Sequence, residues 1–386
     1  MFSSRLPDRL APNALAACVA DARARSRALV DLTVSNPTSV GLPYPPALLA
    51  PLGREAGVTY APEPFGLPSA RRAVAAFVSR DGVRVDPDQI VLTASTSEAY
   101  SLLFKLLCDD GDDVLVPEPS YPLFDLLTRL DDVRQTPYRL EYHGCWSIDR
   151  ESLLAACTRR TRVILIVSPN NPTGSRLRRA DRDWLVDVAR DRGLTLISDE
   201  VFIDYPVAPR PDADSLLGES RVLTVTLGGL SKSAGLPQVK LGWMVVGGPE
   251  ALVGEAMTRL EVICDTYLSV STPVQLAVQD LLDAGALVRE AIGTRVLTNY
   301  RVLETAVSAE PGISLLPAEG GWAAVIRVPA TSSEEALVLR LVQDAGVLVH
   351  PGYFFDFTGG AHLVLSLLPP PDVFADATAR VLEAAR

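Results

Sequence analysis

The stretch RVILIVSPNNPTG, residues 162–174, decides the fold class of this chain. Its continuous run of Val, Ile and Leu is typical of a strand buried on both faces, as in a parallel sheet covered by helices. The run ends in a turn sequence of two Asn followed by Pro, Thr and Gly. Open α/β sheets bind ligands beyond the carboxyl ends of such strands, so this turn is a candidate ligand loop. An ordinary surface turn has the same composition, and position alone does not separate the two alternatives.

Similar apolar runs occur on both sides of this stretch, and helical patterns such as Glu98–Leu107 and Asp181–Arg192 lie between them. Strand, helix, strand repetition predicts an α/β sheet that is mostly parallel, with helices in the crossovers. The strand candidates are Ile90–Thr93, Val114–Val116, Arg162–Val167, Leu194–Ser198, Val222–Leu227 and Leu241–Val246.

The pattern changes at about Leu287. A long amphipathic stretch, Leu287 to about Ser308, precedes two further strand candidates, Ala323–Val328 and Leu363–Leu367. This order predicts a second, smaller α+β domain, and we expect the N-terminal helix candidate at Asn13–Ala28 to pack with it. The predicted division is a large α/β domain at 31–286 and a small domain formed by 1–30 and 287–386.

Composition excludes several classes of function. The 386 residues are 48% hydrophobic, which is enough for a large core, and 36 basic against 47 acidic side chains leave a net charge of −11. A surface of this sign repels nucleic acid and anionic lipid. No apolar run approaches the roughly 18–20 residues of a spanning helix, and Ala14–Ala20 is a poor secretory segment because it meets Asp21. We therefore expect a soluble cytoplasmic protein.

Cysteine and histidine usage argues against a metal centre. The five cysteines are widely spread and form no CxxC pair, and the three histidines lie far apart in the sequence. A disulfide framework or a structural zinc site needs paired spacings, so neither is expected.

The segment TASTSEAY, residues 93–100, joins a strand end to a helix predicted to open at about Glu98. Three hydroxyl residues lie at the junction: Ser95, Thr96 and Ser97. Free N–H groups and the positive dipole end of a helix N-terminus bind anions, phosphate above all. The simpler alternative is that Ser97 only caps the helix.

Two charged side chains also follow predicted strands. Asp199 comes directly after Leu194–Ser198 and could pair with a cationic nitrogen of a ligand. Lys232 follows another strand among glycines that let a ligand approach the backbone, which makes it a candidate Schiff-base nucleophile. Lys240 could supply a second positive charge. A solvated surface lysine and a surface carboxylate are the plainer alternatives.

The order and spacing of these motifs resembles the class I/II aminotransferases, which are fold-type I enzymes that use pyridoxal 5′-phosphate. The resemblance extends from about Asn36 to Ser366 and implies a seven-stranded type of sheet in the large domain. It rests on Tyr60 with GLPSARR, TASTSEAY, PEPSYPLF, SPNNPTG, SDEVFIDY and the Ser-Lys pair that ends at Lys232.

The resemblance implies a role for each matching residue. Lys232 would hold the cofactor as a Schiff base and shuttle the Cα proton, and Asp199 would face the pyridine nitrogen. Asn171 would donate to the ring O3′, and Tyr121 would stack on the ring. The remaining matches would bind the phosphate: Ser95, Thr96, Ser97, Lys240 and, from the neighbouring subunit, Tyr60. The last of these implies a homodimer with shared active sites.

Three residues depart from the family pattern around the cofactor. Phe202 replaces a tyrosine whose hydroxyl donates to O3′, so the pKa of the Schiff base should rise. Gly229 replaces a serine that contributes a hydroxyl to the phosphate. Lys240 replaces an arginine, which keeps the charge and loses the bidentate fork.

The fourth departure concerns the substrate. Val364 occupies the place of the arginine that binds the substrate α-carboxylate in the family. Three explanations are open. Another cation binds the carboxylate, the substrate has no free α-carboxylate, or the register of the comparison with the family pattern has slipped. Arg327 is the first candidate for a replacement, although a surface or packing arginine is an equal alternative, and Trp322 is a candidate pocket residue.

The expected activity is therefore a transaminase that uses an amino acid donor and a 2-oxo acid acceptor. A β-elimination lyase or another biosynthetic reaction on the same scaffold is the alternative, motivated by Val364 and Phe202. A non-catalytic sensing relative would carry a DNA-binding domain ahead of Asn36, where the chain has no room for one. A nicotinamide or nucleotide enzyme is set aside because GxGxxG does not follow the first strand and GxxxxGK[ST] does not occur.

Overall fold

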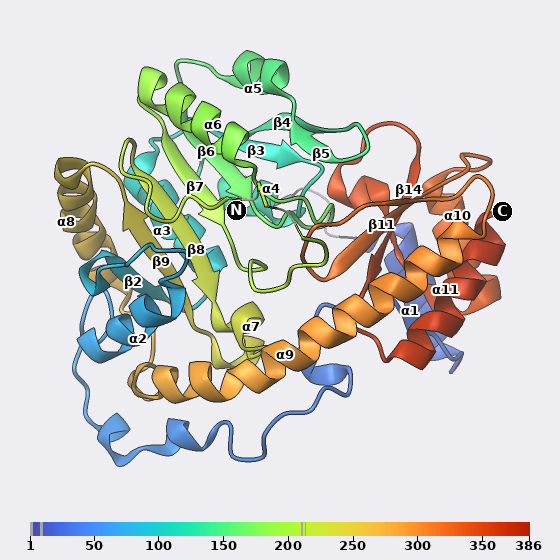
Figure 1. Cartoon of the computed structure of the whole chain (residues 1–386), viewed down its shortest axis with the longest axis horizontal. Helices are drawn as coiled ribbons and strands as arrows, with labels where there is room; N and C mark the ends of the chain where they lie inside the picture. Colours follow the sequence, from blue (N-terminus) through green and yellow to red (C-terminus); the bar gives the residue numbers. More distant parts are fainter. Residues whose placement is uncertain (1–2, 8–10, 210, 213) are drawn as a thin grey trace.

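The computed structural model describes residues 3–7, 11–209, 211–212 and 214–386 (Figure 1). Its largest element is an eight-stranded sheet with the strand order β2-β9-β8-β7-β6-β3-β4-β5. The strands are β2 (Ile90–Thr93), β3 (Asp113–Glu118), β4 (Arg134–Tyr142), β5 (Trp146–Ile148), β6 (Thr161–Val167), β7 (Thr195–Asp199), β8 (Thr224–Gly229) and β9 (Gly242–Gly247). The six predicted strands are all present, with ends within two residues of their expected positions.

The middle of this sheet is parallel. Strands β4, β3, β6, β7 and β8 pair in parallel, whereas β9 runs antiparallel between β8 and β2, and β5 folds back on the edge of β4. Val167 pairs with Asp199, and Asp199 pairs with Leu227. The carboxyl ends of β6, β7 and β8 are therefore level, which brings the loops that follow them to one edge of the sheet.

Helices cover both faces of the large sheet, as the continuous apolar runs predict. Val163 and Leu165 of β6 pack in one cluster with residues of α3 and α8, whereas Ile164 and Ile166 pack in another with residues of α5 and α6. The helices of this part are α2 (Pro68–Val78), α3 (Thr96–Leu107), α4 (Leu123–Leu130), α5 (Arg150–Ala156), α6 (Arg179–Arg192), α7 (Leu230–Ser233) and α8 (Glu250–Tyr267).

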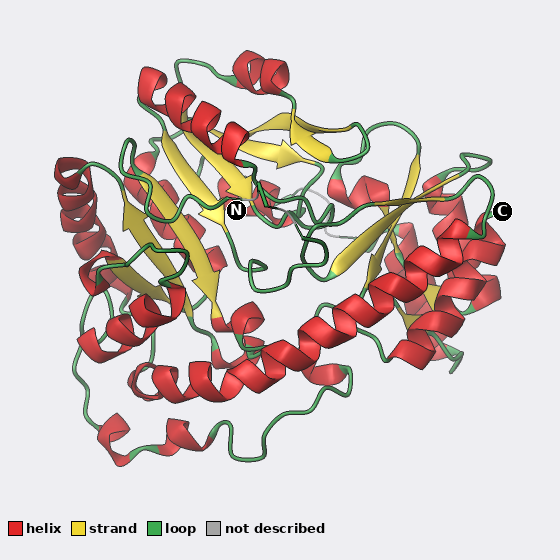
Figure 2. Cartoon of the chain, viewed as in Figure 1, coloured by secondary structure: helices red, strands yellow, loops and turns green. Residues whose placement is uncertain are grey.

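A second, antiparallel sheet has the strand order β10-β11-β14-β13, and helices lie beside it (Figure 2). Its strands are β10 (Ser314–Leu316), β11 (Ala323–Val328), β13 (His350–Pro351) and β14 (Ala361–Ser366), and the helices are α1 (Ala14–Ala24), α10 (Glu334–Arg340) and α11 (Pro371–Ala385). Helix α1 contacts α10, and β1 (Val30–Asp31) pairs in parallel with β12 (Val347–Leu348). The N-terminal segment thus packs with the C-terminal part, as expected. The helix itself ends at Ala24, four residues before the predicted end.

One long helix, α9 (Thr272–Ser308), runs from the large sheet to the second sheet and is orange in Figure 1. It contacts α2 at one end of its course and α11 at the other. The expected start at Leu287 was wrong because buried residues recur at helical spacing from Gln275 onward. The predicted boundary between 286 and 287 falls inside this helix, and the division into two domains stays a prediction.

Among the described residues, no helix has both the length and the apolar character that crossing a bilayer requires.

Candidate active site

A cavity of about 620 Å³ lies at the carboxyl ends of β6, β7 and β8, and we call it the main cavity. It brings together eight of the residues singled out in the sequence: Ser95, Thr96, Ser97, Tyr121, Asn171, Asp199, Lys232 and Lys240. Seven of these residues come from five separate motifs and Lys240 lies eight residues after Lys232, and the sheet register explains why they converge.

Lys232 lies on the short helix α7, directly after β8. Its Nζ is 4.5 Å from the ring centroid of Trp322 and 5.3 Å from that of Phe202. Burial lowers the pKa of Lys232 to about 8, while the carboxylate of Asp199 acts in the opposite direction. More of this amine is therefore unprotonated near neutral pH than of an ordinary lysine, which suits a nucleophilic or proton-transferring role.

Asp199 is a buried carboxylate at the end of β7. The hydroxyl of Tyr100 donates a 2.7 Å hydrogen bond to its Oδ2, and the Val201 N–H donates a 3.2 Å bond to Oδ1. Burial raises the pKa of Asp199, and these two hydrogen bonds and Lys232 oppose the rise. The pocket thus holds a carboxylate that a cationic ring nitrogen would stabilise in its ionised form.

Tyr100 is a site residue that the sequence analysis did not single out. It lies inside α3, four residues after Thr96, and also lines the main cavity. Residues four apart share one face of a helix, so the position of Thr96 at a candidate ligand loop was the signal that could have indicated it.

The N-terminus of α3 opens into the main cavity. Ser95 is its cap, because the Ser95 hydroxyl accepts a 3.1 Å hydrogen bond from the Glu98 N–H. The helix therefore begins at Thr96, not at about Glu98, and the predicted alternative of a Ser97 cap is wrong. Thr96 and Ser97 occupy the first turn, where backbone N–H groups have no partner within the helix.

Gly242 keeps this helix end open. A Cβ at position 242 would lie 3.2 Å from the Thr96 nitrogen and 3.1 Å from Thr93 Oγ1. Gly242 also lines the main cavity. Glycine at this position therefore leaves a space beside the helix N-terminus that a side chain would fill.

Close packing also explains the glycine at position 229. A Cβ there would lie 3.1 Å from the Leu241 carbonyl oxygen and 3.3 Å from the Cα of Gly242. The approach of β9 thus leaves little room for the serine of the family pattern. Lys240 is exposed, adopts a left-handed φ of 58°, and supplies a positive charge to the rim of the main cavity.

A second cavity of about 290 Å³ adjoins the first, and we call it the side cavity. The two cavities share Ser35, Tyr121, Asn171 and Phe202 as lining residues. The side cavity continues toward the second sheet, where its walls include Trp322, His350 and Val364.

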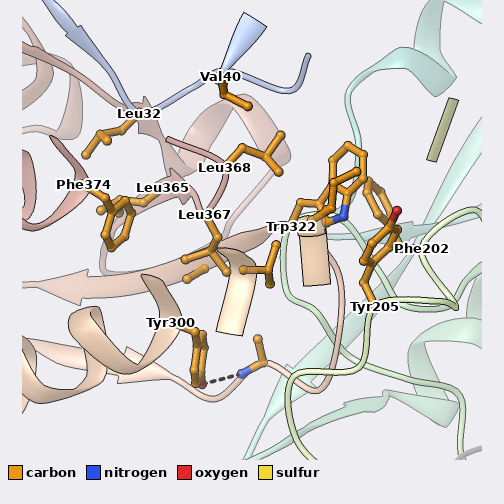
Figure 3. Packing of buried hydrophobic residues seen from close by; sticks show 14 of the residues in the cluster. Leu32, Val40, Phe202, Tyr205, Tyr300, Trp322, Leu365, Leu367, Leu368 and Phe374 are labelled. Atoms are coloured by element: carbon orange, nitrogen blue, oxygen red, sulfur yellow. Dashed lines mark hydrogen bonds between the residues drawn. The ribbon is translucent and has the colours of Figure 1, made fainter. Parts of the chain in front are cut away.

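Trp322 forms the aromatic wall between Lys232 and the second sheet. Its ring packs edge-on against Phe202 and Tyr205, with centroid distances of 5.4 Å and 5.1 Å (Figure 3). The Tyr205 hydroxyl in turn donates to the Lys232 carbonyl oxygen. Trp322 is thus fixed by packing, and its side chain lies beside the amine of Lys232.

Two candidate residues lie outside both cavities. Arg327 is exposed on β11, opposite His362 in the strand register, and lines neither cavity. Tyr60 is 74% exposed and lines a different surface pocket together with Tyr267. The other predicted residues line one of the two cavities around Lys232, whereas Arg327 and Tyr60 line neither.

Known proteins resemble this chain along most of its length. The family model described as aminotransferase class I and II matches residues 36–367. An alanine aminotransferase of Mycobacterium tuberculosis is 28% identical over 362 residues, which cover 90% of this chain and 83% of that protein. The glutamate-pyruvate aminotransferase AlaA of Escherichia coli K12 is 27% identical over 354 residues, which cover 89% and 87%.

Solved structures of the same kind superpose on nearly the whole chain. An alanine aminotransferase from Pyrococcus furiosus covers 99% of both chains with a TM-score of 0.87 and 25% identity. An aspartate aminotransferase variant of Thermus thermophilus, at 24% identity, has the same fold, with a TM-score of 0.86 over 100% of this chain and 99% of its own. The expected fold type I is confirmed, and the short β5 brings the large sheet to eight strands. This chain therefore belongs to the class I and II aminotransferases, which use pyridoxal 5′-phosphate to move amino groups between amino acids and 2-oxo acids.

Proposed function

We propose that Lys232 holds the cofactor and moves the proton at the substrate Cα during transamination. The observation that carries this proposal is the convergence of a buried amine, a buried carboxylate and an open helix N-terminus on one cavity. When bound, pyridoxal 5′-phosphate supplies an electron sink that stabilises the carbanion left by loss of the Cα proton.

The two ends of the main cavity fit the two ends of this cofactor. The first turn of α3 and the Lys240 ammonium suit the phosphate, and Gly242 leaves space beside that turn. At the other end, the Asp199 carboxylate suits the protonated ring nitrogen, and a hydrogen bond from Tyr100 holds this carboxylate in place. Tyr121 and Asn171 would contact the ring between them.

Lys232 has the properties that proton transfer requires. Its lowered pKa of about 8 lets it accept and return a proton near neutral pH. The rings of Trp322 and Phe202 lie against its amine and limit the access of water to it. Proton transfer to and from the substrate Cα is therefore favoured over exchange with solvent.

The relatives indicate the substrate class. Curated relatives are named alanine aminotransferase and glutamate-pyruvate aminotransferase, so we infer a small amino acid donor such as alanine. The side cavity, with about 290 Å³ beside Lys232, is large enough for such a molecule.

Absorption spectroscopy and peptide mapping test the proposal. The purified holoenzyme should form pyruvate from L-alanine and 2-oxoglutarate from L-glutamate, with the pyridoxamine form of the cofactor left on the protein. Borohydride reduction should label Lys232 alone. A label on another lysine, or no 2-oxo acid from a broad donor panel with the cofactor bound, would contradict the proposal.

We also infer a cytoplasmic homodimer. Tyr60 lines a surface pocket with Tyr267, which is 52% exposed, and Val58, two residues before Tyr60, is 85% exposed. A second copy that covers this surface would bring Tyr60 to a neighbouring main cavity. Tyr60→Phe should then weaken cofactor binding in a protein that sediments as a dimer, although Tyr60 does not line its own main cavity. A monomer, or unchanged cofactor affinity, would contradict this inference.

The alternative activity is β-elimination, for which Val364 and Phe202 are the supporting observations. Ammonia and pyruvate released from a β-substituted alanine, without the pyridoxamine form, would distinguish this reaction from transamination.

A further inference from the structure

His350 lies beside the position where the family pattern places its carboxylate-binding arginine. Val364 is buried there and lines the side cavity. His350 on β13 is directly opposite Val364 in the antiparallel register. Residues directly opposite in an antiparallel pair project to the same face, with Cβ atoms roughly 4.5–5.5 Å apart. The imidazole of His350 therefore reaches the side cavity from the place that the missing arginine would occupy.

Two side chains that line the side cavity each carry a nitrogen without a hydrogen-bond partner among the described residues. These nitrogens are Trp322 Nε1 and His350 Nδ1, and both atoms are buried. The Trp322 side chain is only 5% exposed, and its indole N–H can only donate. Because a buried polar group without a partner is destabilising, this pair indicates an acceptor that the polypeptide does not supply.

The side chains that line the side cavity limit which group could bind an anionic ligand there. Among the described residues, those that line the side cavity include no Arg, Lys, Asp or Glu, so His350 is the lining side chain that can become a cation. Burial lowers the pKa of His350, and the carboxylate of Asp31 on β1 acts in the opposite direction. Tyr121 is the other titratable group on these walls. An anion bound against the imidazole would raise the pKa of His350, and the imidazole would then take up a proton.

We propose that His350 and the indole N–H of Trp322 bind the substrate carboxylate in place of the arginine that is absent at Val364. This assignment rests on the proposed transamination of amino acids. The two N–H donors suit the two oxygens of a carboxylate, and the aromatic packing of both rings holds them in place. The His350 ring packs edge-on against Phe355 at a centroid distance of 5.7 Å. The side cavity shares four wall residues with the main cavity that Lys232 lines, so an amino group on the same small molecule lies within reach of that site.

The test compares an amino acid with its amide in the holoenzyme. L-Alanine and L-alaninamide, or the amino acid turned over fastest and its amide, are assayed by the absorbance change of the bound cofactor. His350→Gln and Trp322→Phe should each raise KM for the amino acid about 10- to 100-fold, the effect expected for a lost hydrogen bond to a charged group. The value of kcat should change less, and KM for the amide should stay within twofold, so the preference for the amino acid falls.

A pH profile adds a readout that loss of packing alone would not produce. Inhibition by pyruvate should weaken in the wild type as the pH rises through the pKa of His350 in the complex, because the neutral imidazole binds the anion less well. In His350→Gln this part of the pH dependence should disappear. An identical profile in both proteins would overturn the assignment.

His362→Gln is the matched control. His362 is also buried, lies on the adjacent strand β14 and has an unpartnered Nδ1, but it does not line the side cavity. Its KM and amino acid preference should match the wild type. The assignment is overturned if the wild type does not prefer the amino acid to its amide, or if the preference is lost in Arg327→Gln and kept in His350→Gln. A wild type that turns over no amino acid overturns the proposed transamination instead, and the assignment with it.

Discussion

Tyr100 donates a 2.7 Å hydrogen bond to Asp199, a residue 99 positions later in the chain. The bond joins a helix that begins at the main cavity to the strand end that carries its buried carboxylate. Both side chains are buried, so the Tyr100 hydroxyl provides a hydrogen bond that water would provide to an exposed aspartate. Tyr100 is therefore one of three groups, with the Val201 N–H and Lys232, that favour the charged form of Asp199.

Tyr100→Phe removes that hydrogen bond and leaves the ring in place. The pKa of Asp199 should rise further, because one of the contributions that lower it is lost. A carboxylate left without its donor costs about 1–3 kcal/mol. We expect cofactor affinity to fall about tenfold or more, measured by titration of the apoprotein with pyridoxal 5′-phosphate.

The matched control for this variant is Tyr138→Phe. Tyr138 is equally buried, and its hydroxyl donates to the Leu165 carbonyl oxygen away from the main cavity. Its loss should lower the melting temperature without a change in cofactor affinity. Equal cofactor affinities in the two variants would show that Tyr100 acts only through stability.

The lowered pKa of Lys232 predicts the pH dependence of cofactor attachment. Only the unprotonated amine is nucleophilic, so attachment should accelerate as the pH rises and level off above about 8. An ordinary lysine would level off only near its pKa of about 10.4. Stopped-flow recombination of the apoprotein with pyridoxal 5′-phosphate measures this profile, and Lys232→Arg should show no attachment. A midpoint near the ordinary lysine value would contradict the burial argument.

Gly229→Ser restores the family serine but should not improve cofactor binding. Its Cβ would meet the backbone of β9, 3.1 Å from the Leu241 oxygen, so β9 or α7 has to shift. We expect a loss of about 1–3 kcal/mol in the free energy of unfolding, measured by denaturant titration. Gly254→Ser, on α8 with no atom within 4 Å of its Cβ, should cost much less. A more stable Gly229→Ser protein with tighter cofactor binding would be the opposite result.

Phe202→Tyr should lower the pKa of the Schiff base formed with Lys232. Phe202 lies on the walls of both cavities, and its ring is 5.3 Å from Lys232 Nζ. A hydroxyl there would donate toward the cofactor oxygen and favour the unprotonated base, by roughly one pKa unit or 1.4 kcal/mol. Spectrophotometric titration of the holoenzyme measures the change. An unchanged or higher pKa would show that the hydroxyl does not reach that oxygen.

The buried strands of the large sheet could be predicted from the sequence, whereas β4 and β5 at one end of the sheet could not. Strand β6 is a continuous apolar run because helices cover both of its faces. Strand β4, between β3 and the short β5, has an irregular burial pattern and contains Pro137, so it lacks the apolar signature. Strands of two residues, such as β12 and β13, are too short to show any period.

Several residues that line the main cavity could be predicted from the sequence because they lie at or shortly after the ends of buried strands. Asn171, Asp199 and Lys232 all follow strands whose carboxyl ends the register makes level. His350 could not be predicted, since its position depends on the pairing of a two-residue strand with β14. That register is set by tertiary packing of the second sheet and leaves no pattern in the sequence.

The long helix α9 also fixes the distance between two of its side chains that bind backbone carbonyl groups elsewhere in the chain. Its Arg289 donates to the Ser233 carbonyl oxygen, next to Lys232, and its Asn299 donates to the carbonyl oxygens of Leu367 and Pro369 beyond β14. These anchors are ten residues apart, or about 15 Å along a continuous helix. The helix thus sets the spacing between the backbone next to Lys232 and the segment that follows β14. One residue inserted between the anchors would turn the second by about 100° and detach it, so this segment should tolerate changes of sequence far better than changes of length.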